Sequence, residues 1–293
     1  PAVTAGPGPA RAPTARGLLQ ACSASEPVDD ELGVTATNRT ATSYAETAQA
    51  AGGEVKFAYV VPDFSNPTGK TVSVEGRQHI LSLADELDIP VIEDNPYTAL
   101  RYEGEAQPFV QALDVAARGS IDLSRVIHLG SFSKVFTPGL RVGWVCAAKP
   151  IIQRLILVKQ ASDLNASALN QAVMCRLAEQ EFDAQVERAC DSYRVKRAAM
   201  LEALAEHMPE GATSSKPEGG LFGWVTLPEG YDTAELLPKV VGDARVAYVP
   251  GHACFADGSG RNTLRISLSL PTPEVIREGV ARLGKVFRQH ASA

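Results

Sequence analysis

The sequence of 293 residues has no apolar run near the ~20 residues that a membrane-spanning helix needs. It also lacks the basic excess of a dedicated nucleic-acid binder, because 28 Lys and Arg stand against 34 Asp and Glu. The five cysteines form no CxxC motif, and the five histidines form no HExxH or HxxxH pair. Zinc and thioredoxin-like motifs are therefore missing, and reduced thiols are expected. We expect a cytoplasmic protein with no metal, membrane or nucleic-acid partner.

The first 27 residues differ in character from the rest of the chain. Prolines interrupt them repeatedly and apolar residues are few, so we expect residues 1–27 to be an atypical, disordered segment. From Val28 the pattern becomes that of a folded domain. Apolar runs predict strands over residues 56–62, 89–93, 126–129 and 142–147, a helix over 73–88, and mainly helix over 150–207.

Strands that alternate with helices predict an α/β fold with a mostly parallel sheet and helices on both faces. After about residue 208 the pattern changes. Strands are predicted over 217–226, 245–249 and 263–270, followed by an amphipathic helix over 273–290. We therefore predict part of a large domain over 28–180 and a smaller C-terminal α+β domain over 181–293.

Polar clusters follow three of the predicted strands. They are Ser65–Gly69, Asp94–Tyr97 and Ser131–Lys134. Ligand sites of open α/β sheets lie beyond the carboxyl ends of the strands. An amide, a carboxylate, a phenol, hydroxyls and an amine at one edge would suit a charged, aromatic, phosphorylated ligand.

Lys134 lies in the largely apolar stretch SFSKVFTPGLRVGW, which also contains Arg141. A lysine acts as a nucleophile when desolvation or neighbouring cations keep it partly deprotonated. An imine-forming lysine beside a phosphate-binding serine and arginine is what pyridoxal 5′-phosphate needs. That cofactor also requires an acid opposite its pyridinium nitrogen, and Asp94 is the candidate for it.

Gly69-Lys70-Thr71 imitates the end of a nucleotide-binding P-loop. That motif needs a glycine five residues before its Gly-Lys pair, and Phe64 occupies this position. A nucleotide site is therefore not expected.

Four segments, DFSNPTG, EDNPYTALRY, SFSKVFTPGLRVGW and NTLRIS, together resemble the class I/II aminotransferases, which are fold-type I pyridoxal phosphate enzymes. The resemblance is to the branch that contains 2-aminoadipate, kynurenine and aromatic aminotransferases and the aminotransferase-like domains of MocR regulators. It covers the chain from about Val28 onward. It implies amino-group transfer from an α-amino acid to a 2-oxo acid, and a homodimer.

The resemblance also implies roles for individual residues. Lys134 would form the internal aldimine with pyridoxal 5′-phosphate and then move the proton between the substrate Cα and the cofactor. Asp94 would pair with the pyridine nitrogen. Tyr97 and Asn66 would hydrogen-bond the phenolic oxygen of the cofactor.

The phosphate of the cofactor would be held by Ser131, Ser133 and Arg141. Arg265, from the second domain, would bind the substrate α-carboxylate through a bidentate contact, and Asn66 would also contact the substrate. The segment Glu218–Trp224 is expected to line the substrate side.

The family normally carries a long stretch ahead of the segment that resembles Val28–Val34. That stretch holds a phosphate-binding loop and an aromatic residue that stacks on the pyridine ring. Neither is found here; Tyr44 is the only aromatic nearby, and its place suggests a helix. Three alternatives stay open: a non-catalytic cofactor-sensing domain of a MocR-like regulator, a truncated inactive homologue, and a carbon–sulfur lyase of the same fold.

Overall fold

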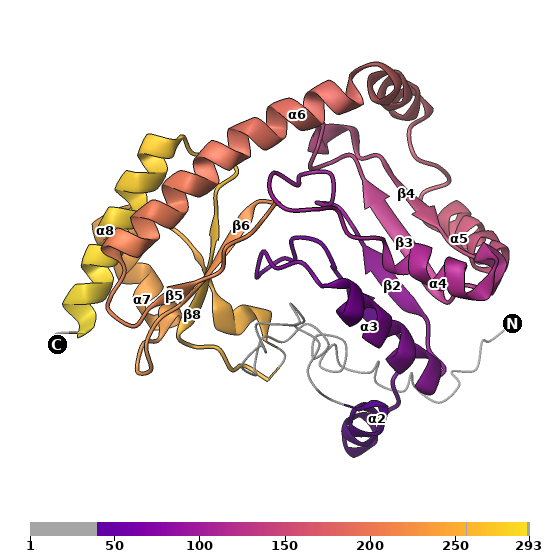
Figure 1. Ribbon diagram of the computed structural model, residues 1–293, viewed down its shortest axis with the longest axis horizontal. Helices are drawn as coiled ribbons and strands as arrows, with labels where there is room; N and C mark the ends of the chain where they lie inside the picture. Colours follow the sequence, from indigo (N-terminus) through magenta and orange to yellow (C-terminus); the bar gives the residue numbers. More distant parts are fainter. Residues whose placement is uncertain (1–39, 256, 292–293) are drawn as a thin grey trace, which may run out of the picture.

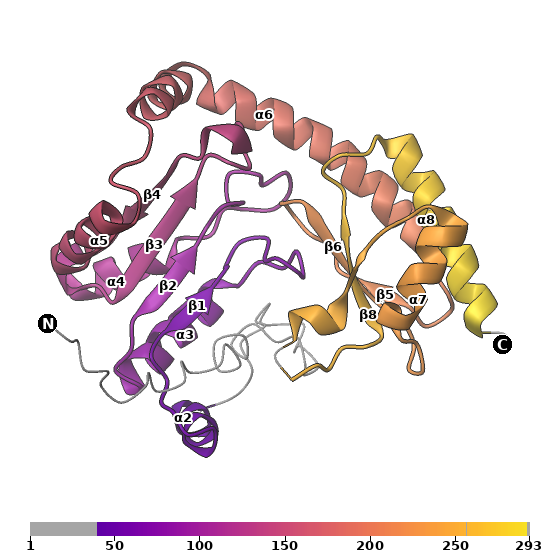
Figure 2. The ribbon, with the colours of Figure 1, turned by 180° about the vertical axis from the view of Figure 1, so that it is seen from behind.

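The computed structural model describes residues 40–255 and 257–291, so the disorder predicted for residues 1–27 lies outside the described part. Two four-stranded sheets stand side by side, and the long helix α6 (Ala168–His207) runs across both of them (Figures 1 and 2). The first sheet has the order β1-β2-β3-β4 and the second β5-β6-β8-β7.

The first sheet is mostly parallel. Strands β1 (Ala58–Val60), β2 (Val91–Asp94) and β3 (Val126–Ser131) run parallel, and β4 (Gly143–Cys146) is antiparallel to β3. Helices α3 (Val74–Glu86) and α4 (Val110–Arg118) connect the parallel strands, as a parallel sheet requires. Before them, α2 (Ala41–Ala50) carries Tyr44, so the expected helix is present there.

Alternation along the strands separates the two faces of this sheet. Val60, Val91 and Val126 are buried and form one apolar cluster with residues of α3 and α4. Their neighbours Tyr59 and Ile92 point to the opposite face and are only half-buried. One face is therefore a helix-covered core, and the other carries part of the polar clusters predicted at the strand ends.

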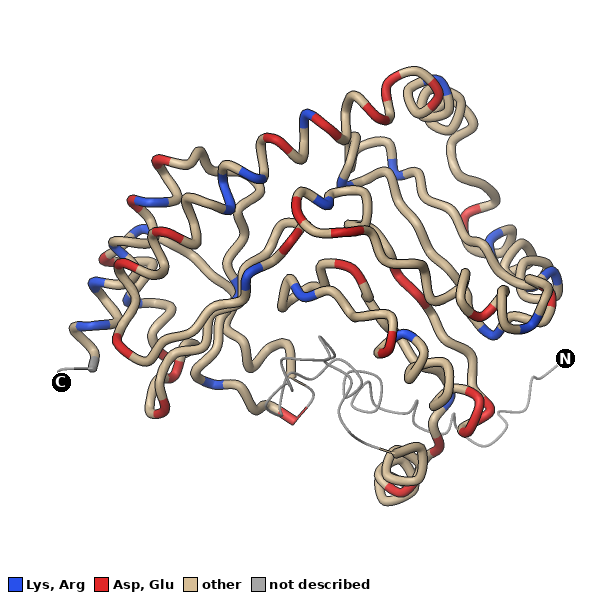
Figure 3. Tube along the Cα trace, in the orientation of Figure 1, with Lys and Arg blue, Asp and Glu red and all other residues tan. Residues whose placement is uncertain are grey.

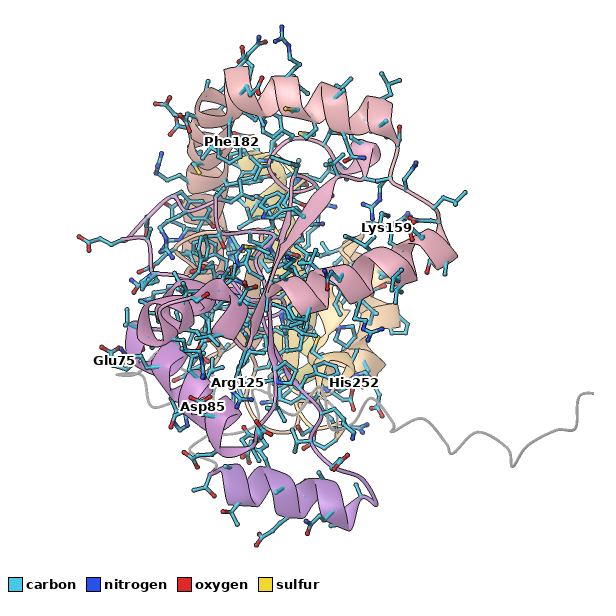
Figure 4. The ribbon with its side chains drawn as sticks, turned by 90° about the vertical axis from the view of Figure 1, so that its right-hand side faces the viewer. Glu75, Asp85, Arg125, Lys159, Phe182 and His252 are labelled. Atoms are coloured by element: carbon cyan, nitrogen blue, oxygen red, sulfur yellow. The ribbon has the colours of Figure 1, made fainter. Side chains whose placement is uncertain are left out.

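The second sheet is antiparallel and consists of β5 (Thr213–Ser214), β6 (Phe222–Thr226), β7 (Val249–Pro250) and β8 (Thr263–Ser267). Helices α7 (Thr233–Lys239) and α8 (Pro273–Ala291) pack with it around a core to which α6 contributes Met200 and Leu204. Further along α6, Phe182 packs against a third cluster, which contains Tyr97 and Val135 (Phe182 is labelled in Figure 4). The domain boundary predicted at 180/181 therefore falls inside a continuous helix that contacts both parts.

Most of the predicted elements are present; most strands are shorter than predicted, whereas β3 extends to Ser131. The strand predicted over 56–62 is reduced to β1, and the one over 245–249 is misplaced, because β7 covers only Val249–Pro250. A π-helical turn, Val240–Ala244, precedes it, and Arg245 then adopts a left-handed φ of 54°, which cannot continue a strand. Helix α5 (Lys149–Ser162) and α6 fill the region predicted as helical.

Charges of both signs are mixed over the surface. Along α6 and α8, Lys and Arg alternate with Asp and Glu (Figure 3). At the end of α3, Asp85 pairs with Arg125 at 2.9 Å (both labelled in Figure 4). Among the described helices, none combines the length and apolarity needed to cross a membrane.

Glu93 joins β2 to α4. Its side chain is fully buried and accepts hydrogen bonds from the backbone N–H groups of Val110 at 2.7 Å and Gln111 at 3.0 Å. Helix α4 has no cap from its own N-cap residue, Phe109, so Glu93 satisfies its free N–H groups from a neighbouring strand. His128 Nδ1 lies 3.1 Å from the same carboxylate. Burial by itself would raise the pKa of Glu93, but His128 and the two N–H donors together hold this pKa below its ordinary value.

We predict that Glu93→Gln lowers the free energy of unfolding by about 1.5–3 kcal/mol at pH 7, because a charge-assisted cap is lost. The pKa of Glu93 is lowered from 4.5 on folding, so its stabilisation is complete above that pH and disappears as the pH falls below it. Urea unfolding at pH 7, 5.5 and 4 measures the difference in free energy of unfolding between wild type and Glu93→Gln. This difference should become smaller as the pH falls. Replacing the exposed Glu46 by Gln is the control and should change the free energy of unfolding by less than about 0.5 kcal/mol. If Glu93→Gln lowered the free energy of unfolding equally at all three pH values, the prediction would be contradicted.

Candidate functional site

Asp94 is the last residue of β2 and lies at the carboxyl edge of the parallel sheet. The next residue continues the ladder, because Asn95 N–H donates to Leu129 O at 2.9 Å. One carboxylate oxygen of Asp94, Oδ2, accepts a hydrogen bond from the hydroxyl of Tyr59 on β1 at 2.5 Å. The predicted acid thus stands at the sheet edge, half-buried and held from the neighbouring strand.

Tyr97 lies just beyond Asp94 and is buried. Its ring meets the ring of Phe222 edge to face, with centroids 5.8 Å apart. Burial raises the pKa of Tyr97, and the negative charge of Asp94 raises it further. The positive charge of Arg265 favours the phenolate and opposes this shift, but burial outweighs it. The phenol therefore stays protonated at neutral pH and can donate a hydrogen bond.

The loop over 62–72, which carries Asn66, is closed by its own backbone. Val72 N–H donates to Pro62 O at 2.8 Å, and Ser65 N–H donates to Lys70 O at 2.8 Å. Arg77 of α3, fully buried, donates through Nε to Val72 O at 3.0 Å and through Nη2 to Asp63 at 2.7 Å. One buried guanidinium therefore holds both ends of the loop.

Arg265 of β8 reaches this loop from the second sheet. Its Nη1 donates to Asn66 Oδ1 at 2.5 Å, and its guanidinium carbon lies 4.5 Å from the centre of the Phe222 ring. The Nε of Arg265 is buried and has no hydrogen-bond partner among the described residues. Arg265 is thus oriented by an amide and an aromatic face while it keeps a free donor.

The remaining predicted residues share one loop between β3 and β4. Ser131 ends β3, and its Oγ accepts from Ser133 N–H at 3.1 Å. Phe132 N–H donates to Val142 O at 3.2 Å, which places Arg141 opposite Ser133 across the loop. A single turn between them, with Phe136 N–H bonded to Phe132 O at 2.9 Å, presents Lys134 at the surface.

The eight predicted residues therefore form two groups. Asn66, Tyr97 and Asp94 lie with Arg265 where the two sheets meet, and the loop of β3 and β4 holds the other four: Ser131, Ser133, Lys134 and Arg141. Packing joins the groups, because Val135, next to Lys134, lies in the same apolar cluster as Tyr97. Within residues 40–255 and 257–291, no hydrogen bond or ion pair links one group directly to the other.

The donor set fits pyridoxal 5′-phosphate. Asp94 keeps one oxygen without a hydrogen bond from any described residue, and the amine of Lys134 is likewise unpaired in the described part of the chain. Arg265 has its free Nε. One group thus offers an acid, a phenol and a guanidinium, and the other offers an amine, hydroxyls and a second guanidinium, which is the chemistry that this cofactor and an amino acid together require.

Sequence reasoning missed several residues that shape the site. Tyr59, the partner of Asp94, reads in the sequence as one more strand residue, and only its place in the sheet reveals it. Arg101 is a second such residue. It bonds Glu218 at 2.8 Å and Asp63 at 3.4 Å, and so ties the 62–72 loop to the segment that leads into β6.

Comparison with known proteins places the chain in a family. Residues 44–283 match the family model of aminotransferase class I and II. The chain therefore belongs to this family, as the motifs predict. It is 41% identical over 239 residues to aromatic-amino-acid aminotransferase 1 of Thermococcus litoralis, an alignment that covers 81% of this chain and 55% of the relative.

A crystal structure of kynurenine aminotransferase from Pyrococcus horikoshii superposes with a TM-score of 0.79 at 38% identity, covering 85% of this chain and 60% of that one. This likeness confirms the predicted fold-type I architecture. A Bacillus subtilis protein described as an uncharacterised HTH-type transcriptional regulator is 30% identical over 80% of this chain and 47% of its own length. The chain thus spans between 47% and 60% of the length of these three proteins.

We predict that Arg77→Met costs about 3–5 kcal/mol of the free energy of unfolding, because it leaves the carboxylate of Asp63 buried without its main partner. Arg282→Met is the matched control. Arg282 pairs with Glu278 one helical turn away on the exposed face of α8, and loss of such a pair should cost less than about 1 kcal/mol. Denaturant unfolding of both variants measures the difference. Equal costs would show that the buried pair does not hold the loop.

Proposed function

We propose that this protein is a pyridoxal 5′-phosphate-dependent aminotransferase, which moves an amino group from an α-amino acid to a 2-oxo acid. The observation that carries the proposal is the hydrogen bond between Arg265 and Asn66. It brings a carboxylate-binding guanidinium from the second sheet to the edge of the first, beside Tyr97 and Asp94.

Two findings support the choice of cofactor. The first is that the donor set at the sheet edge fits it. The second is that the matched Pyrococcus horikoshii structure is described as a complex with PMP (pyridoxamine 5′-phosphate), with kynurenine as substrate. When bound, the cofactor supplies an electron sink that stabilises negative charge at the substrate Cα. The protein must then hold the amino acid and move its protons.

Arg265 binds the α-carboxylate of the amino acid through two parallel N–H donors. Asn66 Oδ1 accepts a hydrogen bond from the guanidinium, and the face of the Phe222 ring packs against it. Because Asn66 uses its carbonyl oxygen for Arg265, its NH2 group stays free to donate to the phenolic oxygen of the cofactor. Tyr97 donates to that oxygen as well, since its raised pKa keeps the hydroxyl protonated.

Lys134 takes the proton from Cα and returns it, in addition to holding the cofactor between turnovers. Its position on a surface turn, beside the packed residue Val135, allows the amine to move while the turn stays fixed. The turn itself is tied to α6, because Gln185 Nε2 donates to Val135 O at 3.1 Å.

The phosphate of the cofactor is assigned to Ser131, Ser133 and Arg141. Arg141 has a left-handed φ of 54° at the end of a 3-10 turn, and its Nη1 donates to Pro138 O at 3.4 Å. Asp94 accepts from the protonated ring nitrogen with its free oxygen. We further propose a cytoplasmic location, which the free thiols of Cys146, Cys175, Cys190 and Cys254 support.

The similarity to a transcriptional regulator favours one alternative, a cofactor-binding sensor without turnover. Both functions use the same lysine and the same phosphate contacts. They differ in whether bound amino acid is converted, so a single experiment can separate them.

We predict that the full chain, incubated with pyridoxal 5′-phosphate and reduced with borohydride, retains cofactor covalently on the peptide that contains Lys134. Lys134→Ala should retain none, and its amino-transfer rate should fall at least about a hundredfold, because proton transfer by the lysine is lost. Peptide mass spectrometry and a panel of amino donors with 2-oxo acids measure the two effects.

Lys285→Ala, an exposed lysine on α8, is the control and should behave as wild type. Retention of cofactor without conversion of any donor would favour the sensor function. Equal retention by wild type and Lys134→Ala would refute the proposed role of the lysine.

We also propose a homodimer. The exposed strand β4 and helix α5, which has no buried residue, form a largely apolar surface. It consists of Trp144, Val145, Leu155, Ile156, Leu157 and Val158. A helix that is apolar on several sides is normally covered, and a second copy of the chain is the occupant that the family resemblance implies.

Light scattering after size exclusion should therefore give the mass of a dimer, and Leu157→Glu should shift it toward the monomer. Leu270→Glu is the control, since Leu270 is exposed and follows β8 of the second sheet, away from β4 and α5. A wild-type chain that is monomeric at all concentrations would contradict the dimer.

A further inference from the structure

Tyr59 and Asp94 meet across two neighbouring parallel strands. Tyr59 of β1 is in register with Ile92 of β2, and Asp94 stands two residues further along. Side chains two residues apart point to the same face of a strand, so Tyr59, Ile92 and Asp94 share one face. Two residues span about 6.6 Å along a strand, which is the reach of a tyrosine side chain, and the hydroxyl arrives at Asp94 Oδ2 at 2.5 Å.

Tyr59 is the polar residue of β1 and stands between two apolar ones. Its chain neighbours Ala58 and Val60 belong to the apolar cluster beneath α3 and α4, whereas Tyr59 belongs to none of the three clusters formed by the described residues. The strand residues beside Asp94 on its face, Ile92 and Leu129, are aliphatic and offer no donor. Tyr59 therefore supplies a hydrogen bond that the rest of this sheet face does not.

The hydrogen bond makes the two carboxylate oxygens of Asp94 inequivalent. Oδ2 is occupied by the hydroxyl of Tyr59, while Oδ1 accepts no hydrogen bond from the described residues. A carboxylate at the end of a strand can rotate about its side-chain bonds. A donor fixed on one oxygen removes that freedom and leaves the other oxygen to a ligand.

We propose that Tyr59 is a positioning residue for the cofactor: it holds the carboxylate of Asp94 so that Oδ1 accepts from the protonated ring nitrogen. The proposal rests on the proposed function. It assigns to β1, a strand without a predicted site residue, a part in cofactor recognition. It also predicts a specific signature, because Tyr59 should matter only for ligands that possess the ring nitrogen.

The test compares two ligands on the full chain by calorimetry. One is pyridoxamine 5′-phosphate, and the other is its 1-deaza analogue, in which a C–H group replaces the ring nitrogen. For Tyr59→Phe we expect the Kd of pyridoxamine 5′-phosphate to rise about tenfold, since a charge-assisted hydrogen bond that orients the partner is lost. The Kd of the deaza analogue should change less than about twofold. In an Asp94→Asn background, Tyr59→Phe should add no further loss for either ligand.

Tyr248→Phe is the matched control. The hydroxyl of Tyr248 donates to Thr233 O at 2.6 Å in the core of the second sheet, away from the site. It should leave both Kd values unchanged even if the melting temperature falls. Equal weakening of both ligands by Tyr59→Phe, or no change in either, would overturn the role of Tyr59. A wild-type chain that binds both ligands equally would overturn it too, because Asp94 would then make no use of the ring nitrogen. A wild-type chain that binds neither ligand would instead refute the proposed function.

Discussion

Arg77 and Asp63 form an ion pair at 2.7 Å in which neither side chain has appreciable solvent exposure. A buried guanidinium needs partners for all of its donors, and Arg77 finds them in the carbonyls of Pro62, Val72 and Pro108 as well as in Asp63. The 62–72 loop must therefore pass close to α3 in one path. That path sets the position of Asn66, and through Asn66 the position of Arg265.

The same loop is where the two sheets meet. Phe64 is fully buried with a left-handed φ of 51°, and its ring fills the space where Gly219 and Gly220 would carry side chains. This backbone conformation is costly for a bulky residue, so packing on both sides must maintain it. Arg101 lies over the Phe64 ring at 4.6 Å and bonds Glu218 beyond it. The segment that leads into β6 is thus fastened to the first sheet before β6 and β8 present Phe222 and Arg265 to the site.

The sequence predicts those parts of this arrangement that depend on local pattern. The helix predicted over 73–88 appears as α3, and the polar clusters after the strands do lie at one sheet edge. Elements governed by a single side-chain contact are missed. Helix α7 begins where Asp232 caps the N–H groups of Ala234 and Glu235 and contains Pro238, so neither its start nor its length follows from apolar spacing. The contacts of Tyr59, Arg77 and Arg101 depend on strand register and on residues far apart in the chain, which one sequence does not reveal.

Side chains alternate between the two faces of a strand, and this explains why the adjacent carboxylates of Glu93 and Asp94 on β2 have different surroundings. Glu93 points to the face covered by α3 and α4, where two backbone N–H groups and His128 surround it and leave no oxygen free. Asp94, one residue on, points to the half-buried face, where Tyr59 occupies one oxygen only. A shift of one residue in the register of β2 would exchange these environments. Helix α4 would then lose its cap, and the site would lose its acid, so the packing of the core and the chemistry of the edge depend on the same register.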